Sequence, residues 1–146
     1  MAVQLRKYAA IFGGRAVAQA KGDRLPSEGP TRAMILLVED EVLVRMSVAD
    51  ELRRAGYLVF EASSADEALD LLHDNTVQLV LSDIRMPGTM DGAELARAIR
   101  AQHPQIKIVL ASGQSFSAKY WGDYDGFFPK PYDSSRLIQH IKRLVG

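Results

Sequence analysis

Beyond residue 33 the sequence alternates short apolar runs with stretches whose apolar residues recur at helical spacing. The apolar runs predict strands at 33–38, 57–62, 77–82, 106–111 and 126–129. The periodic stretches predict helices at 42–55, 64–74, 91–103 and 134–145. Apolar runs of this kind are typical of parallel strands buried on both faces, and parallel strands need long crossovers. The sequence therefore predicts an α/β fold: a doubly wound, five-stranded parallel sheet with helices on both faces.

Residues that start and stop helices support these boundaries. Gly56 follows the first periodic stretch, where a glycine commonly ends a helix. Ser64 and Glu67 have the spacing of a capping box, and Asp91 precedes Glu94 at the same spacing. These residues predict where the first helix ends and where the second and third begin.

Residues 1–32 differ in charge from the rest of the chain. They carry six basic and two acidic side chains, although the whole chain has 18 of each. The segment ends in a stretch rich in proline and glycine, 25–30, which is typical of a linker. We expect 1–32 to be a basic extension and linker, with a disordered tail or a partner-docking helix both open, and 33–146 to be one domain.

Composition excludes several classes of function. The absence of cysteine excludes disulfides, a thiol nucleophile and sulfur-bound zinc, and three scattered histidines leave little for a histidine metal site. The balanced charge gives no overall attraction to nucleic acid. No apolar run approaches the roughly 20 residues that span a bilayer. We therefore expect neither direct nucleic-acid binding nor membrane insertion.

Chemically active side chains follow four of the predicted strands. Glu39 and Asp40 follow the first strand, Asp83 the third, Ser112 the fourth and Lys130 the fifth. The carboxyl ends of parallel strands lie at one edge of a sheet, where ligands collect. Three carboxylates at one edge repel each other, and oxygen ligands favour Mg²⁺ as the balancing cation. A carboxylate beside Mg²⁺ and an amine can attack phosphorus, so the pattern indicates phosphorylation of an aspartate.

The motifs around these residues are Ile-Leu-Leu-Val-Glu-Asp-Glu at 35–41, Leu-Ser-Asp-Ile-Arg-Met-Pro-Gly at 81–88, Val-Leu-Ala-Ser-Gly at 109–113 and Phe-Phe-Pro-Lys-Pro at 127–131. In this order the chain closely resembles the response-regulator receiver domain of two-component signalling, over about residues 33–146. It is most similar to the stand-alone, chemotaxis-regulator-like form. The resemblance implies a flavodoxin-like sheet in the order 2-1-3-4-5 and a cytoplasmic location.

The resemblance also implies a role for each site residue. Asp83 would accept a phosphoryl group from a phosphohistidine on a sensor histidine kinase or a phosphotransfer protein. Asp40 would bind Mg²⁺ directly and Glu39 mainly through water, while Asp83 and the carbonyl of Arg85 would complete the metal site. Lys130 would pair with the phosphate.

A conformational switch is implied in the same way. Ser112 would bind a phosphoryl oxygen, and Phe127 would follow it inward. Arg85 and Gln114 stand where family side chains flank the attacking water and tune phosphoryl lifetime, although solvated loop residues are an equal alternative for both. The chain is shorter than is usual for the family between 112 and 127, so we expect a short or irregular fourth helix there.

Two other functions are less consistent with the sequence, and several outputs stay open. An aspartate-nucleophile phosphohydrolase would carry its Asp-x-Asp after the first strand, whereas Asp83 follows the third. A flavodoxin-like cofactor binder would need a phosphate-cradling loop where the acidic residues 39–41 stand. The chain stops after its last predicted helix, so we expect no effector domain and no activity beyond self-phosphorylation and autodephosphorylation. An adapter for a downstream protein, a relay intermediate and a phosphate sink all stay open.

Overall fold

A parallel sheet lies at the centre of the computed structural model, which describes residues 32–113 and 123–146. The elements are β1 (Met34–Val38), α2 (Val42–Arg54), β2 (Leu58–Ala62), α3 (Ala65–Asp74), β3 (Leu79–Asp83), α4 (Gly92–Gln102), β4 (Lys107–Ser112), β5 (Gly126–Pro129) and α5 (Ser134–Val145). Every pairing is parallel, and the strand order is β2-β1-β3-β4-β5. This confirms the predicted fold class and strand order.

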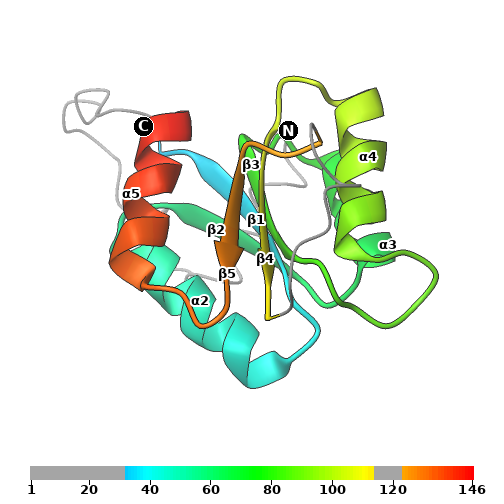
Figure 1. Ribbon diagram of the computed structural model, residues 1–146. Coiled ribbons are helices and arrows are strands. Elements are labelled where there is room, and N and C mark those ends of the chain that lie inside the picture. Colours follow the sequence, from blue (N-terminus) through cyan, green and yellow to red (C-terminus); the bar gives the residue numbers. More distant parts are fainter. Residues whose placement is uncertain (1–31, 114–122) are drawn as a thin grey trace, which may run out of the picture. The chain divides into compact units, whose positions relative to one another are not determined.

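Helices cover both faces of this sheet, as predicted. In Figure 1, α2 and α5 lie on one side and α3 and α4 on the other. Alternate residues of β1 serve the two layers, because successive side chains of a strand point to opposite faces. Ile35 and Leu37 pack in the layer with α2 and α5, whereas Leu36 and Val38 pack in the layer with α3 and α4. Burial on both faces explains why these strands are apolar throughout.

Two strand boundaries differ from the prediction in a way that concerns the polar residues. β3 begins at Leu79, later than expected, and includes Asp83 as its last residue. β4 likewise includes Ser112. Both strands run on because their neighbours continue the pairing: Asp83 lies opposite Ala111, and Ser112 opposite Pro129. Asp83 and Ser112 are therefore held by the sheet itself and not by the loops that follow it.

The helix caps largely match the prediction. Gly56, which follows the α2 C-cap Ala55, has a φ of +102°, a conformation that glycine adopts without strain. The hydroxyl of Ser64 accepts the Glu67 N–H at 3.2 Å. The Glu67 carboxylate, however, reaches the N–H and hydroxyl of Ser63, at 2.8 and 2.7 Å, one residue earlier than a standard capping box.

Some predictions fall on residues that the structure does not describe. These are the structure of the basic extension, the conformation of the short or irregular helix expected between 112 and 127, and the position of Gln114. Within residues 32–113 and 123–146, no helix has the length and apolar content needed to cross a bilayer.

Candidate functional site

Three carboxylates meet at the carboxyl end of the sheet. Glu39 and Asp40 follow β1, and Asp83 ends β3 on the neighbouring strand. One carboxylate oxygen from each residue lies within 4.8 Å of the other two. Glu39 is buried, and Asp40 and Asp83 are partly buried. The structure thus brings together the acidic residues that the sequence analysis singled out.

Lys130 joins this cluster from the residue after β5. Its Nζ donates to Oε2 of Glu39 at 3.0 Å and to Oδ2 of Asp83 at 3.3 Å. Burial by itself would lower the pKa of Lys130, but the hydrogen bond to Glu39 and the charges of Asp83 and Glu39 outweigh it, so the pKa lies above its usual value. Lys130 is therefore charged at neutral pH and partly neutralises the repulsion among the carboxylates.

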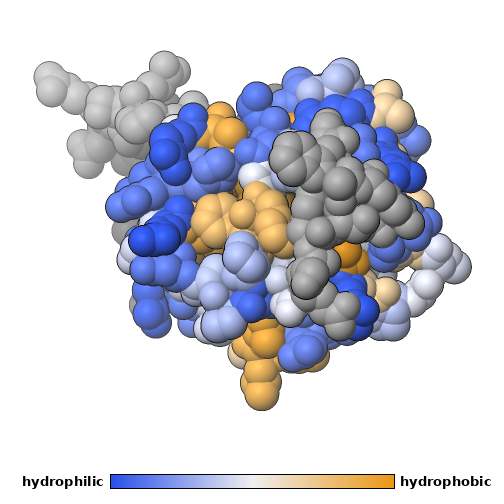
Figure 2. Space-filling view, in the orientation of Figure 1, coloured by the Kyte–Doolittle hydropathy of each residue, from blue (hydrophilic) through white to orange (hydrophobic). Residues whose placement is uncertain are grey.

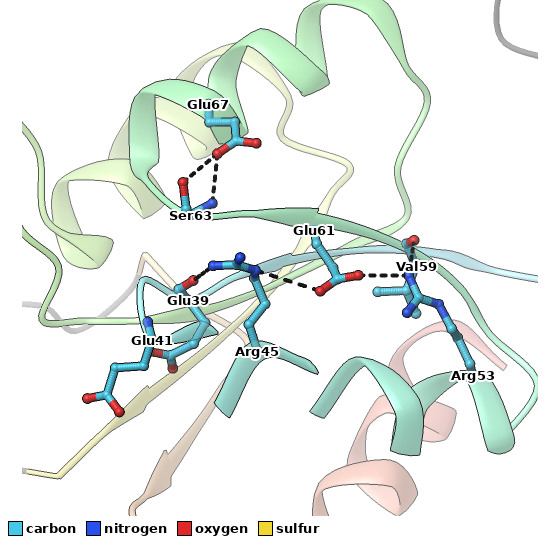
Figure 3. Close-up of polar contacts among 8 residues, drawn as sticks. All are labelled: Glu39, Glu41, Arg45, Arg53, Val59, Glu61, Ser63 and Glu67. Carbon is cyan, nitrogen blue, oxygen red and sulfur yellow. Dashed lines mark hydrogen bonds and ion pairs between the residues drawn. The ribbon is translucent and has the colours of Figure 1, made fainter. Parts of the chain in front are cut away.

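Glu39 is held at each of its polar atoms. Its N–H donates to the carbonyl of Ala62 at 3.0 Å, and its carbonyl accepts Nη1 of Arg45 at 2.8 Å (Figure 3). Its Oε1 accepts the N–H of Glu41 at 3.2 Å, while Oε2 accepts Lys130. Burial raises the pKa of Glu39, and the bonds from Lys130 and Glu41 oppose that rise without cancelling it. Several elements therefore fix the direction of this carboxylate.

Ser112 lies beside Asp83 on the next strand. It follows Ala111, the residue opposite Asp83, and only 4% of its surface is exposed. Its carbonyl accepts the N–H of Lys130 at 2.8 Å, which ties the start of the β5–α5 connection to the end of β4. The sheet thus places Ser112 and Lys130 at the same edge as the acidic cluster.

The remaining predicted site residues lie at different distances from this edge. Phe127 is in β5, partly buried against the core layer that includes α3 and α4. Arg85 is exposed in the connection after β3. Gln114 lies outside the described residues. The structure therefore places Phe127 within β5 and Arg85 in the connection after β3, and leaves Gln114 undescribed.

A cavity of about 420 Å³ opens beside the cluster. It is lined by Asp40, Ile84, Arg85, Met86, Pro87 and Asp91. Asp40, a member of the acidic cluster, therefore lines one part of the cavity, and the connection that follows Asp83 lines another. Space for the hydration shell of an ion, or for a group approaching the carboxylates, is present on this side.

The role of Gly92 could not be predicted from the sequence. This residue begins α4 after the cap Asp91, and its N–H donates to the carbonyl of Ile84 at 2.8 Å. A Cβ added at Gly92 would collide with the carbonyl oxygen of Asp83. Glycine therefore allows the start of α4 to press against the backbone of Asp83. An Asp-Gly pair at a helix start was visible in the sequence, but the strand it touches was not.

The donor set suits a small, hard cation. Mg²⁺ binds oxygen ligands at about 2.0–2.1 Å in an octahedron, so its ligands lie roughly 3–4 Å apart. Carboxylate oxygens within 4.8 Å of each other need only small movements to reach that geometry. Sulfur and imidazole ligands, which zinc prefers, are absent from this group of three. The residues therefore fit Mg²⁺ better than zinc.

Comparisons with known proteins point to one family. The response regulator receiver domain matches residues 35–142. The sensor kinase CckA of Brucella abortus is 40% identical over 119 residues, which are 77% of this chain and 12% of that protein. The transcriptional regulatory protein DctD of Rhizobium meliloti, named for C4-dicarboxylate transport, is 37% identical over 75% of this chain and 24% of its own length. The chain thus spans a quarter or less of these two relatives.

Solved structures give the same result. The response regulator protein TrrA of Thermotoga maritima, in complex with Mg²⁺ and BeF, aligns with a TM-score of 0.73 and 31% identity, over 77% of this chain and 99% of that one. The receiver domain of the hybrid histidine kinase CckA aligns with a TM-score of 0.67 and 35% identity, over 78% and 100%. The first of these structures is a complex with Mg²⁺, the ion that the acidic cluster fits.

Proposed function

Because this chain belongs to the response regulator receiver domain family, we propose that Asp83 accepts a phosphoryl group from a phosphohistidine of a histidine kinase or phosphotransfer protein. The observation that carries the proposal is the position of Asp83, 3.3 Å from the ammonium group of Lys130 and within 4.8 Å of carboxylate oxygens of Glu39 and Asp40. Residues 33–146 form the receiver domain in this proposal, with 1–32 as an extension to it. The cytoplasm, where such kinases present their phosphohistidine, is its proposed location.

The transfer is a displacement at phosphorus. A carboxylate oxygen of Asp83 forms the new O–P bond as the P–N bond to the donor imidazole breaks, and the imidazole nitrogen keeps the bonding pair. Bound at Glu39, Asp40, Asp83 and the carbonyl of Arg85, Mg²⁺ would supply charge neutralisation for the phosphoryl oxygens. Lys130 supplies a second positive charge at 3.3 Å from Asp83 Oδ2. Both charges act on the group whose negative charge must be stabilised.

The response to phosphorylation is proposed to begin at Ser112. Its place next to the Asp83–Ala111 pair supports a hydrogen bond from its hydroxyl to a phosphoryl oxygen. Phe127, on the adjacent strand, would then repack inward, which shifts the balance between two arrangements of the β5 side of the domain. Arg85 and Gln114 are proposed to tune the lifetime of the phosphoryl group, and the exposure of Arg85 beside the cavity supports its part.

An apolar surface beside the site supports a protein as phosphodonor. Val42, Leu43 and Met46, at the start of α2, are 55%, 81% and 57% exposed. Figure 2 shows a hydrophobic projection at the bottom of the molecule, where Figure 1 places the start of α2. Large apolar side chains that are exposed together as a patch commonly mark an interaction surface. We call these three residues the α2 apolar face. The face begins directly after Asp40 and Glu41. It is the proposed contact for the donor.

Output is proposed to run through protein contacts: an adapter, a relay intermediate or a phosphate sink. Rapid loss of the phosphoryl group with back-transfer to the kinase would favour the sink, and phosphate-dependent capture of a third protein would favour the adapter. The phosphohydrolase alternative is not retained, because the family match and the position of Asp83 after the third strand both argue against it.

Intact-mass measurement after incubation with acetyl phosphate and Mg²⁺ tests the proposal. We expect the mass of one phosphoryl group to be added, and the addition to be prevented by a chelator or by Asp83→Asn. Asp70→Asn, at an exposed position of α3, serves as the matched control and should be phosphorylated normally. Phosphorylation that persists in Asp83→Asn would show that another residue is the acceptor.

A further inference from the structure

Resting on the proposed function, we infer that Arg45 is a positioning residue for the metal and phosphoryl site. Within the described residues, Arg45 forms no hydrogen bond or ion pair with the three carboxylates of the acidic cluster. It acts instead on the main chain of Glu39, whose carbonyl accepts Nη1 of Arg45 at 2.8 Å (Figure 3). The guanidinium thus fixes the backbone at the point where β1 ends and the first metal-binding carboxylates begin.

Arg45 is itself anchored to a second strand. Its Nε pairs with Oε1 of Glu61, in β2, at 3.7 Å. The other oxygen of Glu61 pairs with Nη2 of Arg53 at 3.1 Å, and that nitrogen also donates to the carbonyl of Val59 at 3.2 Å. Glu61 is thus held by two arginines of α2, and it presents its carboxylate to Arg45 in a fixed position. Arg45 links α2, the end of β1 and the end of β2.

The chemistry of the guanidinium suits this linking role. The side chain of Arg45 is only 17% exposed, so its contacts compete with little water. A planar fork can reach a carbonyl and a carboxylate at once, with its donors in fixed directions, whereas a lysine ammonium is a single point of charge. Groups that orient the ligands of a metal commonly change its affinity 10–100-fold when removed. Arg45 orients Glu39 in a comparable way, through the hydrogen bond to its main-chain carbonyl.

The loss of charge and the loss of positioning in Arg45→Met predict opposite changes in the affinity for a divalent cation. Loss of a positive charge near an acidic cluster would by itself strengthen the binding of a divalent cation. Loss of a positioning contact would weaken it, because Glu39 and Asp40 would no longer be held in the arrangement that the ion requires. The sign of the change in Arg45→Met therefore distinguishes the two effects.

The experiment measures Mn²⁺ affinity by electron paramagnetic resonance in the unphosphorylated full chain, with Mg²⁺ as competitor. We expect Arg45→Met to weaken binding on the order of tenfold, and Arg45→Lys to recover part of the loss. Arg53→Met is the matched control: it removes the other arginine of Glu61 and leaves the bond to Glu39 in place. It should bind Mn²⁺ within about twofold of the wild type, since it alters no contact of the acidic cluster.

A second measurement does not need the metal. The N–H of Glu39 is bonded to Ala62, and its hydrogen exchange should be faster in Arg45→Met than in the wild type or in Arg53→Met. Unchanged or tighter Mn²⁺ binding with unchanged exchange in Arg45→Met would overturn the inference, as would an equal loss in Arg53→Met. A wild-type chain that binds no Mn²⁺, with the exchange difference still present, would instead count against the proposed metal site.

Discussion

The ammonium nitrogen of Lys130 lies 3.3 Å from Oδ2 of Asp83, although 47 positions separate the two residues in the sequence. The same nitrogen lies 3.0 Å from Glu39. The ammonium group of Lys130 therefore lies where the carboxylates would also attract a bound cation. It provides positive charge at the site in the unphosphorylated domain. In the proposed function this one side chain would thus compete with the metal and assist the transfer.

Replacing Lys130 should change these two properties in opposite directions. In Lys130→Met, we expect Mn²⁺ to bind more tightly by roughly 1 kcal/mol, because one positive charge has left the cluster. Phosphorylation by acetyl phosphate should slow on the order of a hundredfold, because the transferred group loses a charged partner. Metal affinity is measured by paramagnetic resonance and the rate by intact mass. Lys142→Met, exposed on α5, should change neither. Weaker metal binding in Lys130→Met would contradict this account.

Gly92→Ala should disturb the site through the backbone. The added methyl group would meet the carbonyl of Asp83, a main-chain atom that cannot rotate away. We expect the free energy of unfolding to fall by about 1–3 kcal/mol, as for other overpacked sites, and Mn²⁺ affinity to fall as Asp83 shifts. Urea unfolding measures the free energy of unfolding, and metal titration measures the Mn²⁺ affinity.

Gly113→Ala provides the comparison for this substitution. A Cβ at Gly113 meets no atom of residues 32–113 or 123–146 within 4 Å, and this glycine also directly follows a residue of the site. Its stability should stay within about 0.5 kcal/mol of the wild type. If the two alanine variants unfold alike, the close approach of α4 to Asp83 is not what requires a glycine at position 92.

Asp125 should make stability depend on acidity. Its Oδ2 accepts the N–H of Ile108 at 2.9 Å and Nη2 of Arg100 at 2.9 Å. Burial alone would raise the pKa of Asp125, but these bonds outweigh it and place the pKa below its ordinary value of 3.8. Because the folded state prefers the ionised form, this stabilisation is complete above pH 3.8 and is lost as the pH falls through the lower folded value.

Asp125→Asn tests that dependence. We expect it to be less stable than the wild type by about 1.5–3 kcal/mol at pH 7, the usual contribution of hydrogen bonds to a charged group. The gap should narrow below pH 3.8, as measured by urea unfolding across that range. Asp70→Asn, exposed on α3, should match the wild type throughout. A gap that does not change with pH would mean that shape, and not charge, accounts for the effect of the substitution.

Local pattern was enough to predict the sheet and the residues at its edge. Apolar runs mark buried strands, and the polar residue that ends a run must lie at the strand's end, so Asp83 and Lys130 could be placed at one edge. The final residues of β3 and β4 could not be predicted, because pairing with a neighbouring strand decides them. The roles of Gly92 and Arg45 were also hidden. Gly92 leaves room for the main-chain carbonyl of Asp83, and Arg45 donates to that of Glu39; a sequence does not show which residue lies against a distant carbonyl.

The α2 apolar face should matter for a protein donor and not for a small one. Leu43 is 81% exposed, so Leu43→Ser should leave the free energy of unfolding within about 0.5 kcal/mol of the wild type. Its phosphorylation by acetyl phosphate should be unchanged. Transfer from any purified histidine kinase that phosphorylates the wild type should fall about tenfold in kcat/KM, because we expect Leu43 to be one of the few contact residues whose loss costs more than about 1 kcal/mol. Gln139→Ser, exposed on α5, should transfer normally. Equal transfer to both variants would place the donor on another surface of the domain.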